Sequence, residues 1–596
     1  MPDDDHNTSR RTFIKAAGAG AFAVAASGLG AGSTLAATTG SVAPSRKKRA
    51  TKSTHKGPYN IVFILTDQER YFETYPQSAE LHAREKMQEE GVSFENHYTC
   101  SNMCTASRSV IYTGQHIQKT GMFDNTNCPW QPDMSTDIPT IGDRLRELGY
   151  YTAYKGKVHL SRKVEPDDSG KIKTDAMEPY GFSDYNARGD EYGHLQGGYT
   201  HDNTFAADAV DWLRSRGTRL GEKKQPFFLG VNLVNPHDIM YFDTDAPGTP
   251  VQNNGSLLNE IKPGPKNSIY ERTHPDLPLP KNLYQPVQEK GRPRAHYEYE
   301  KGWNAMLGKI PDKNQNWQRY RDYYLNCLKD VDMQINNVLE ELDRLGMMEN
   351  TIVIFTADHG EMAGDHHLRG KGPFSYEENI HLPLFVMHPG IDGGQKTRAV
   401  TSHVDLVPTI LAMTGMDHKK VAEAGKDLPG KNLTDLLKKP ASVTFDAIRP
   451  GALYCYDMFM TIDADFIEKS AKVLAEGGGK AEFKKQDIKP DLKKRGAMRT
   501  IFDGRYKFTR YFSPVEHNTP RDYKELVKYN ELELYDLHND PREMQNLAIH
   551  LPKNKELVMT MNDKLNELID AEVGKDEGQQ LPGYPDVNWA VTDFRD

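Results

Sequence analysis

The sequence has no excess of positive charge, few cysteines and no internal repeat. Its 84 acidic residues outnumber the 75 lysines and arginines, and the formal net charge of -9 argues against nucleic acid as the main partner. The 5 cysteines are an odd number, so at least one thiol has no intramolecular disulfide partner. Hydrophobic residues make up 37% of the chain, unlike disordered sequences. A chain of 596 residues suggests one large domain and a smaller one.

The N-terminal segment lacks the strongly apolar residues of a membrane span. The pair Arg10 and Arg11 is followed by a run of alanine and glycine, and residues 1–37 resemble a twin-arginine export signal. Because alanine and glycine contribute little transfer free energy, we expect no stable membrane span. Residues 38–58 are basic and typical of a flexible linker. We therefore expect the twin-arginine translocase as a partner and a periplasmic or secreted location.

Four apolar segments predict buried strands whose C-terminal ends are polar. An apolar stripe from Tyr324 to Leu342, with spacings of three and four, predicts a long helix just before the last of these strands. Alternating helices and buried strands indicate an α/β fold, with a mostly parallel sheet covered by helices on both faces. Ligand sites of such sheets lie beyond the carboxyl ends of the strands. The polar residues at the four ends are Asp67, Gln68, Lys157, His159, His237, Asp358 and His359.

The stretch "CSNMCTASRSVIYTG", residues 100–114, predicts a short helix with Cys104 near its N-terminus. Thr105 and Ser107 favour a helix start, and Gly114 is a plausible terminator. The positive end of the helix dipole and the charge of Arg108 would stabilise a thiolate or another anion at this point. The alternative is a buried or disulfide-bonded cysteine, and the sequence assigns no pairing. The remaining candidates for a disulfide are Cys100, Cys128, Cys327 and Cys455.

Composition along the chain suggests the domain boundaries. Residues 59–440 are expected to form the main domain, and within it 241–316 are rich in Pro, Gly, Asn and charge, which is typical of a long surface loop. Residues 441–596 contain shorter elements and should form a smaller C-terminal subdomain. There, "RTIFDGRYKFTRYF" predicts a hairpin around Asp503 and Gly504.

Several collinear motifs resemble the type I sulfatases. "CTASRSVIYTG" is similar to the family signature, in which a cysteine is oxidised to formylglycine, also called 3-oxoalanine. "NIVFILTDQ", "GKVHL", "NPHD", "ADHGEMAGDH", "SYEENIHLPLFV", "DLVPTIL" and "ELYDLHNDPREMQNLA" follow the family's order. The resemblance implies an alkaline-phosphatase-like fold with a small antiparallel sheet in the C-terminal subdomain. It also implies a sulfuric ester hydrolase.

The resemblance further implies a divalent metal and a set of site residues. Calcium is the first expectation, and manganese competes because Gln68 and His359 replace the Asp and Asn of many arylsulfatases. Taken alone, His159 could be a core histidine and Lys371 a solvated lysine. The implied metal ligands are Asp67, Gln68, Asp358 and His359 together with the modified residue 104. In the implied catalytic set, Arg108 orients the formylglycine, Lys157 and His159 contact it and the sulfate, and His237 and Lys371 grip the sulfate near the leaving oxygen.

The implied reaction is hydrolysis of a sulfate ester. The aldehyde at residue 104 hydrates, one hydroxyl attacks sulfur, and His237 or Lys371 protonates the leaving alcohol. A base, for which His159 is the candidate, then deprotonates the second hydroxyl so that sulfate leaves and the aldehyde returns. A formylglycine-generating or sulfatase-maturing enzyme is the implied partner, acting before export. Ala106 stands where most members have proline, which leaves the identity of that enzyme open.

Two other functions compete with this hypothesis. A phosphonate monoester hydrolase or phosphodiesterase of the same superfamily would also use a Gln and His metal set. The Lys157 and His159 pair in "GKVHL" favours sulfate monoesters, because the rival group is described as lacking it. The second alternative is a silent binding protein with unmodified Cys104. Sulfated glycans, choline-like sulfates, and aryl or alkyl sulfates all remain open as substrates, as does the oligomeric state.

Overall fold

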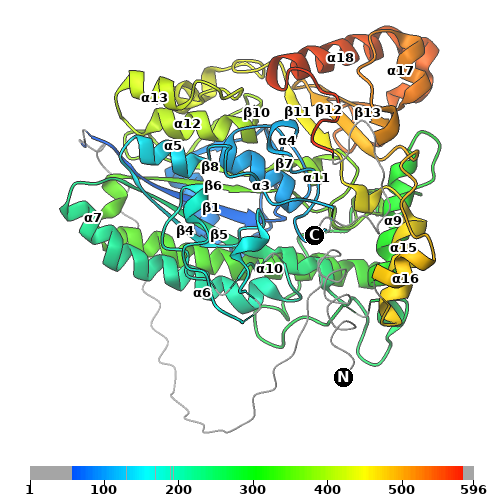
Figure 1. The fold of residues 1–596 in the computed structure, drawn as a ribbon, viewed down its shortest axis with the longest axis horizontal. Coiled ribbons are helices and arrows are strands. Elements are labelled where there is room, and N and C mark those ends of the chain that lie inside the picture. The colour runs from blue at the N-terminus through cyan, green and yellow to red at the C-terminus, as the bar shows by residue number, and fades with distance from the viewer. Residues whose placement is uncertain are drawn as a thin grey trace.

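The computed structural model describes residues 55 and 57–581, apart from positions 129, 168, 188, 192, 259 and 479. Its centre is a seven-stranded sheet in the order β4-β5-β1-β6-β8-β2-β9. Figure 1 shows strands of this sheet, among them β1, β6 and β8, between helices on both sides. The four neighbouring strands β4 to β6 run parallel, whereas β8 is antiparallel to both of its neighbours. The strands are β1 (Asn60–Asp67), β2 (Val92–Phe94), β4 (Tyr151–Gly156), β5 (Phe227–Pro236), β6 (Thr351–Ala357), β8 (Leu384–Met387) and β9 (Gln395–Thr397). The expected mostly parallel α/β sheet is confirmed.

Helices cover both faces of this sheet because alternate strand residues point to opposite sides. Ile61 and Phe63 of β1 pack into one apolar cluster, and Val62 and Ile64 pack into another. The first cluster contains residues of α3 (Cys104–Thr113), α5 (Ile141–Glu147) and α12 (Leu406–Met413). The second contains residues of α2 (His82–Glu90), α6 (Gly197–Trp212) and α10 (Asn314–Arg344). Helix α10 is the long helix that the stripe from Tyr324 to Leu342 predicts.

A four-stranded antiparallel sheet forms the C-terminal part, in the order β11-β12-β13-β14. The predicted hairpin joins β12 (Ala497–Phe502) and β13 (Tyr506–Phe512), whose turn contains Asp503 and Gly504. The outer strands are β11 (Ala452–Tyr456) and β14 (Glu531–Asp536), and α18 (Leu551–Glu572) contacts the sheet. A backbone hydrogen bond from Cys455 N to Cys100 O joins this part to the segment before α3. A third, small sheet contains β10 (Thr401–Ser402), β3 (His97–Tyr98) and β7 (His381–Leu382).

The segment 241–316 differs from the expected surface loop. It contains α8 (Val251–Asn254), α9 (Arg294–Leu307) and the first turn of α10. One face of α9 is buried, with Tyr299, Trp303 and Met306 in an apolar cluster. These residues are spaced by four and three, which is the helix period. The surrounding prolines, glycines and charges hid this short amphipathic pattern in the sequence.

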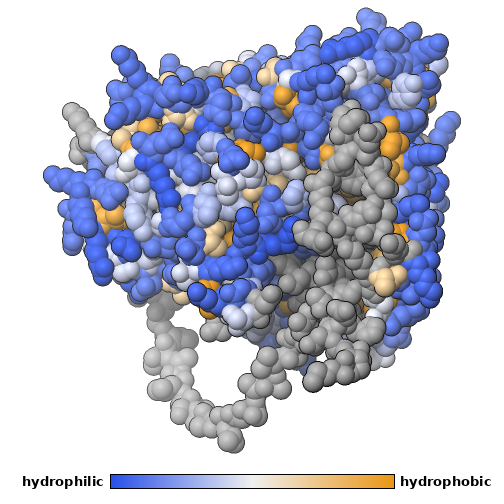
Figure 2. All heavy atoms as spheres, viewed as in Figure 1, coloured by the Kyte–Doolittle hydropathy of each residue, from blue (hydrophilic) through white to orange (hydrophobic). Residues whose placement is uncertain are grey.

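The surface and the termini bear on the remaining expectations. On the face shown in Figure 2, the described surface is mostly hydrophilic with scattered hydrophobic residues. Among the described residues, no helix is long and apolar enough to cross a membrane. The expected export signal, residues 1–37, and most of the expected linker, residues 38–58, lie outside the described residues. All five cysteines lie within the described part, where they are buried and form no disulfide.

Candidate active site and metal centre

The carboxyl ends of neighbouring strands bring the candidate residues together. Asp67 is the last residue of β1, and Asp358 and His359 follow β6, the strand beside it. Lys157 follows β4, and His237 follows β5. The sheet order therefore places four polar strand ends along one edge, as the sequence predicts.

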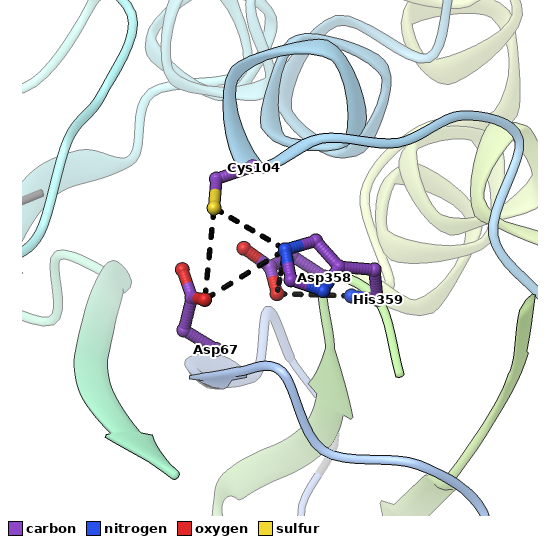
Figure 3. A group of neighbouring side chains, drawn as sticks. All are labelled: Asp67, Cys104, Asp358 and His359. Atoms are coloured by element: carbon purple, nitrogen blue, oxygen red, sulfur yellow. Dashed lines mark hydrogen bonds and ion pairs between the residues drawn. The ribbon is translucent and has the colours of Figure 1, made fainter. Parts of the chain in front are cut away.

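Helix α3 aims Cys104 at this edge (Figure 3). Cys104 is its first residue, and Gly114 ends it in the left-handed conformation at φ 68°. The Cys104 Sγ lies 3.2 Å from His359 Nε2 and 3.7 Å from Asp67 Oδ1. One ligand atom from each of Asp67, Cys104, Asp358 and His359 lies within 4.8 Å of the others, and all four residues are buried.

Arg108 lies one turn after Cys104 and joins the two carboxylates. Its Nε donates to Asp358 Oδ2 and its Nη2 to Asp67 Oδ2, both at 3.1 Å. Its Nη1 donates to the Lys157 carbonyl at 3.1 Å, and Lys157 Nζ donates to Asp67 Oδ2 at 2.5 Å. The side chains of Arg108 and Lys157 thus bind the Oδ2 atoms of the two carboxylates. The Oδ1 atoms of Asp67 and Asp358 lie 3.7 Å and 3.6 Å from His359 Nε2.

The two carboxylates differ in acidity because their neighbours differ. Burial raises the pKa of Asp67, but the positive charges of Lys157, Lys371 and Arg108 outweigh it and hold the pKa well below its ordinary value. Burial and the charge of Asp67 raise the pKa of Asp358 to about 7. A doubly charged cation between them would favour the ionised form of both.

Two histidines, His159 and His237, flank the cluster, and residues of the segment 190–193 contact both of them. Asp190 accepts hydrogen bonds from Val158 N at 2.9 Å and His159 N at 2.5 Å, which fixes the turn after β4. His237 packs on Gly193, where a Cβ atom would lie 2.3 Å from the His237 Cε1. Burial lowers the pKa of both His159 and His237 well below the ordinary value, so both rings are neutral.

Gln68 and Lys371 complete the candidate set. The Lys371 Nζ donates to Gln68 Oε1 at 2.5 Å, and Gln68 N donates to Asp358 Oδ1 at 3.0 Å. Every residue that the sequence predicted for the site therefore lies at this edge. Their individual catalytic and metal-binding roles stay predictions.

Sequence reasoning missed the residues that support the site. Glu361 accepts a hydrogen bond from Gln68 Nε2, and Ser107 Oγ donates to the Asp358 carbonyl at 2.6 Å. Both lie inside the motifs "ADHGEMAGDH" and "CTASRSVIYTG", so a polar residue near a candidate site residue was the available signal. Asp190 and Gly193 lie in a segment without a readable motif, and no sequence signal marked them.

The donor set fits a divalent cation. Two carboxylates, an imidazole nitrogen and residue 104 face one another in a cluster of buried side chains. Arg108 and Lys157 neutralise the oxygens Asp67 Oδ2 and Asp358 Oδ2. Asp67 Oδ1, Asp358 Oδ1, the His359 Nε2 and residue 104 remain as the atoms that could contact a cation.

Comparisons with known proteins identify the family. The family model described as Sulfatase matches residues 59–416. The chain is 24% identical over 577 residues to N-acetylglucosamine-6-O-sulfatase of Bacteroides thetaiotaomicron, covering 87% of this chain and 88% of the relative. It is 25% identical over 473 residues to a protein named uncharacterized sulfatase YidJ of Escherichia coli K12, covering 77% and 76%.

A solved structure of a phosphonate monoester hydrolase from Silicibacter pomeroyi has the same fold. Its TM-score is 0.58 at 20% identity, and the match covers 86% of this chain and 96% of that one. Likeness at this identity concerns the fold alone, whereas the family model spans more than half of this chain. The chain belongs to the sulfatase family and is a sulfuric ester hydrolase. Family membership implies a divalent metal and a formylglycine.

Proposed function

We propose that this sulfatase cleaves a sulfate monoester with a formylglycine made from Cys104. The observation that carries the proposal is the position of Cys104, at the start of α3 and 3.2 Å from the imidazole of His359. Asp67, Gln68, Asp358 and His359 would hold the cation together with residue 104. When bound, the cation would supply positive charge that stabilises negative oxygens on residue 104 and on the sulfate.

The surrounding side chains would position residue 104, bind the sulfate and transfer protons. Arg108 keeps the carboxylates of Asp67 and Asp358 in place and so fixes the position of residue 104. The ammonium groups of Lys157 and Lys371 would neutralise the sulfate oxygens in a site that excludes water. Lys371 would give a proton to the leaving oxygen, and His237 could do so only after its ring has gained a proton on substrate binding. His159, which burial keeps neutral, would take the proton from the hydrated aldehyde when sulfate is released.

Calcium is our first proposal for the cation. Two carboxylates and the amide oxygen of Gln68 are oxygen donors of the kind that calcium prefers. The imidazole of His359 makes manganese the alternative. Removal of metal with a chelator followed by separate additions of CaCl2 and MnCl2 tests the choice, and greater recovery with manganese would reverse it.

Parallel rates on an aryl sulfate and an aryl phosphonate test the reaction class. We expect the sulfate to have the larger kcat/KM, because Lys157 and His159 are both present beside residue 104. The phosphonate monoester hydrolase remains the second candidate on the strength of the Gln68 and His359 pair. A large phosphonate preference would favour it, and a matched Lys157→Met variant should lose the sulfate rate most.

The natural ester is approached with a substrate panel. The name of the Bacteroides relative puts a 6-O-sulfated amino sugar first in the panel, followed by choline sulfate and alkyl sulfates. Mass spectrometry of the tryptic peptide that ends at Arg108 tests the silent alternative. A protein whose residue 104 remains cysteine after production in its own host would favour a binding role.

We also propose export by the twin-arginine translocase to the periplasm or the medium. The paired Arg10 and Arg11 support this proposal. Because this pathway carries folded proteins and α3 is buried after folding, a maturation enzyme would modify Cys104 before export. Unmodified precursor in the cytoplasm alongside modified exported protein would contradict that order.

A further inference from the structure

Glu361 is a fully buried carboxylate that contacts the candidate site without belonging to it. Its Oε1 accepts hydrogen bonds from Gly370 N at 2.7 Å, Ala363 N at 2.9 Å and the Tyr320 hydroxyl at 3.3 Å. Its other oxygen, Oε2, accepts the Nε2 of Gln68. Three donors therefore fix one oxygen of Glu361, and the second oxygen faces Gln68.

The backbone of Gln68 is fixed on both sides. Its N–H donates to Asp358 Oδ1 at 3.0 Å, and its carbonyl accepts from the Tyr324 hydroxyl at 2.9 Å. Its φ of 72° lies in the left-handed region, which a non-glycine residue keeps only where surrounding contacts hold it. The freedom left at Gln68 is which end of its amide points toward Glu361.

An ionised carboxylate accepts hydrogen bonds and cannot donate them. Glu361 therefore selects the NH2 end of the Gln68 amide and leaves Oε1 facing the other way. There, Oε1 accepts the Lys371 Nζ at 2.5 Å. An amide turned the opposite way would place its NH2 group against the Lys371 ammonium, and a cation would also be repelled.

We propose that Glu361 is a positioning residue that sets the direction of the Gln68 amide, so that its oxygen faces Lys371 and the cation. The proposal rests on the function proposed above, in which Gln68 is a metal ligand. It accounts for the glutamine itself, because a carboxylate at position 68 has two equivalent ends and needs no such partner. The effect of Glu361 on cation binding must therefore depend on which residue stands at position 68.

The test is a double-mutant cycle of Glu361→Gln and Gln68→Glu. In E361Q the same three donors still bond to an oxygen, now the amide oxygen of the new glutamine. The NH2 group of that glutamine therefore faces Gln68, and the Gln68 amide must reverse so that its own oxygen accepts from it. In E361Q/Q68E the same NH2 group faces a carboxylate, whose second oxygen still faces Lys371 and the cation. In Q68E alone, two carboxylates face each other.

The readout is the dissociation constant for CaCl2 and MnCl2, measured by calorimetry on the full chain with Cys104 unmodified. We expect E361Q to weaken binding about tenfold or more when Gln68 is present, as losses of metal-supporting partners commonly do. In the Q68E background the same change should weaken binding less than about threefold or strengthen it. Non-additivity of this kind separates orientation from a general structural loss.

Glu533→Gln is the matched control. Glu533 is also buried, but it accepts from the hydroxyls of Tyr511 and Tyr535, which can rotate to suit an amide. It lies on β14, and the control should leave the dissociation constants unchanged. Equal losses from E361Q in the wild-type and Q68E backgrounds would overturn the proposal. A wild-type chain that binds neither cation would instead contradict the metal centre itself, and with it this inference.

A second measurement covers the case in which E361Q alone does not fold. In the Q68E background, E361Q removes one of two facing carboxylates and should raise the melting temperature. A melting temperature lower than that of Q68E would contradict the proposed contact.

Discussion

Two buried arginines, Arg84 and Arg108, each lie between two carboxylates, yet only Arg108 lies in the candidate site. Arg84 Nε donates to Glu69 at 2.7 Å, and its Nη1 donates to Asp332 at 2.8 Å. Arg108 binds Asp67 and Asp358 in a similar way. The difference lies in what the remaining carboxylate oxygens contact.

Within the Arg84 cluster the protein itself supplies the other donors. Glu69 also accepts from the Thr66 hydroxyl at 3.0 Å and the Tyr75 hydroxyl at 2.9 Å. Asp332 also accepts from Ala83 N at 3.0 Å. Strong N–H and O–H donors thus contact the oxygens of both carboxylates, and the cluster stabilises the fold.

Around Arg108 the arrangement is different. Asp358 Oδ1 accepts from the backbone N–H groups of Gln68 and His359, as the carboxylates near Arg84 accept from theirs. Asp67 Oδ1, however, faces the Cys104 thiol and the His359 Nε2, which are themselves potential ligand atoms rather than strong donors. The comparison teaches that the composition of a buried charge cluster does not distinguish structure from function. What distinguishes them is a set of acceptor atoms that converge on one point.

The largest effect is expected where the converging atoms include the nucleophile. Cys104→Ala should lower kcat by at least about 10^3-fold, because neither the arginine nor the carboxylates can replace the oxidised side chain. The melting temperature should change little, since alanine fits the helix start. Rates on an aryl sulfate check this, and retained turnover would place the nucleophile elsewhere.

The variants Arg84→Met and Arg108→Met, measured in parallel, test the difference between the two carboxylate clusters. Arg84→Met leaves two buried carboxylates without their cation and should destabilise the fold by about 3–5 kcal/mol, whatever metal is present. Arg108→Met should be rescued in part by calcium or manganese, because a bound cation can replace the lost charge. Denaturant unfolding with and without each metal measures both, and equal metal responses would remove the distinction.

A smaller effect is expected at the edge of the site. Gly193 has φ +111°, and a Cβ there would lie 2.3 Å from His237 Cε1, so Gly193→Ala should displace the ring and lower kcat about 10- to 100-fold. Gly346 has φ +68° and nothing within 4 Å of the added atom. Gly346→Ala therefore controls for backbone strain and should leave kcat unchanged. Equal kcat values for both variants would argue against a role for His237.

The smallest effect concerns Asp124, a buried carboxylate that accepts hydrogen bonds from Trp130 Nε1 and Phe459 N. Burial raises the pKa of Asp124 from 3.8 to about 6, so in that pH window the folded chain keeps a proton that the unfolded chain releases. Its contribution to stability is present at lower pH and is lost as the pH rises toward 6. Asp124→Asn should flatten this part of the stability profile. Unchanged slopes of melting temperature against pH would contradict the assignment.

The sequence was sufficient for the main sheet because buried parallel strands have long apolar runs. The runs that end on Asp67 and Asp358 are entirely buried, and the sheet order then brings their ends together. Helix α9 was not predicted, because its apolar residues occur within a segment dominated by prolines, glycines and charges. The domain boundary at residue 440 stays a prediction.

The site could be predicted in part. Asp67, Gln68 and Glu69 are consecutive, and composition alone does not say that Glu69 turns away to bind Arg84. The family motif "NIVFILTDQ" includes Asp67 and Gln68 but not Glu69, and it therefore distinguished the candidate ligands from Glu69. The partners Asp190 and Glu361 act through long-range hydrogen bonds, which only the folded backbone reveals.

The central claim is that an oxidised residue 104, held beside a cation at the strand ends, performs the reaction. The most direct test measures turnover of an aryl sulfate against the fraction of residue 104 that mass spectrometry finds as the aldehyde, in preparations made with and without a maturation enzyme. The account predicts that activity rises in proportion to that fraction and vanishes with it. Full activity in chains that retain the thiol would contradict it.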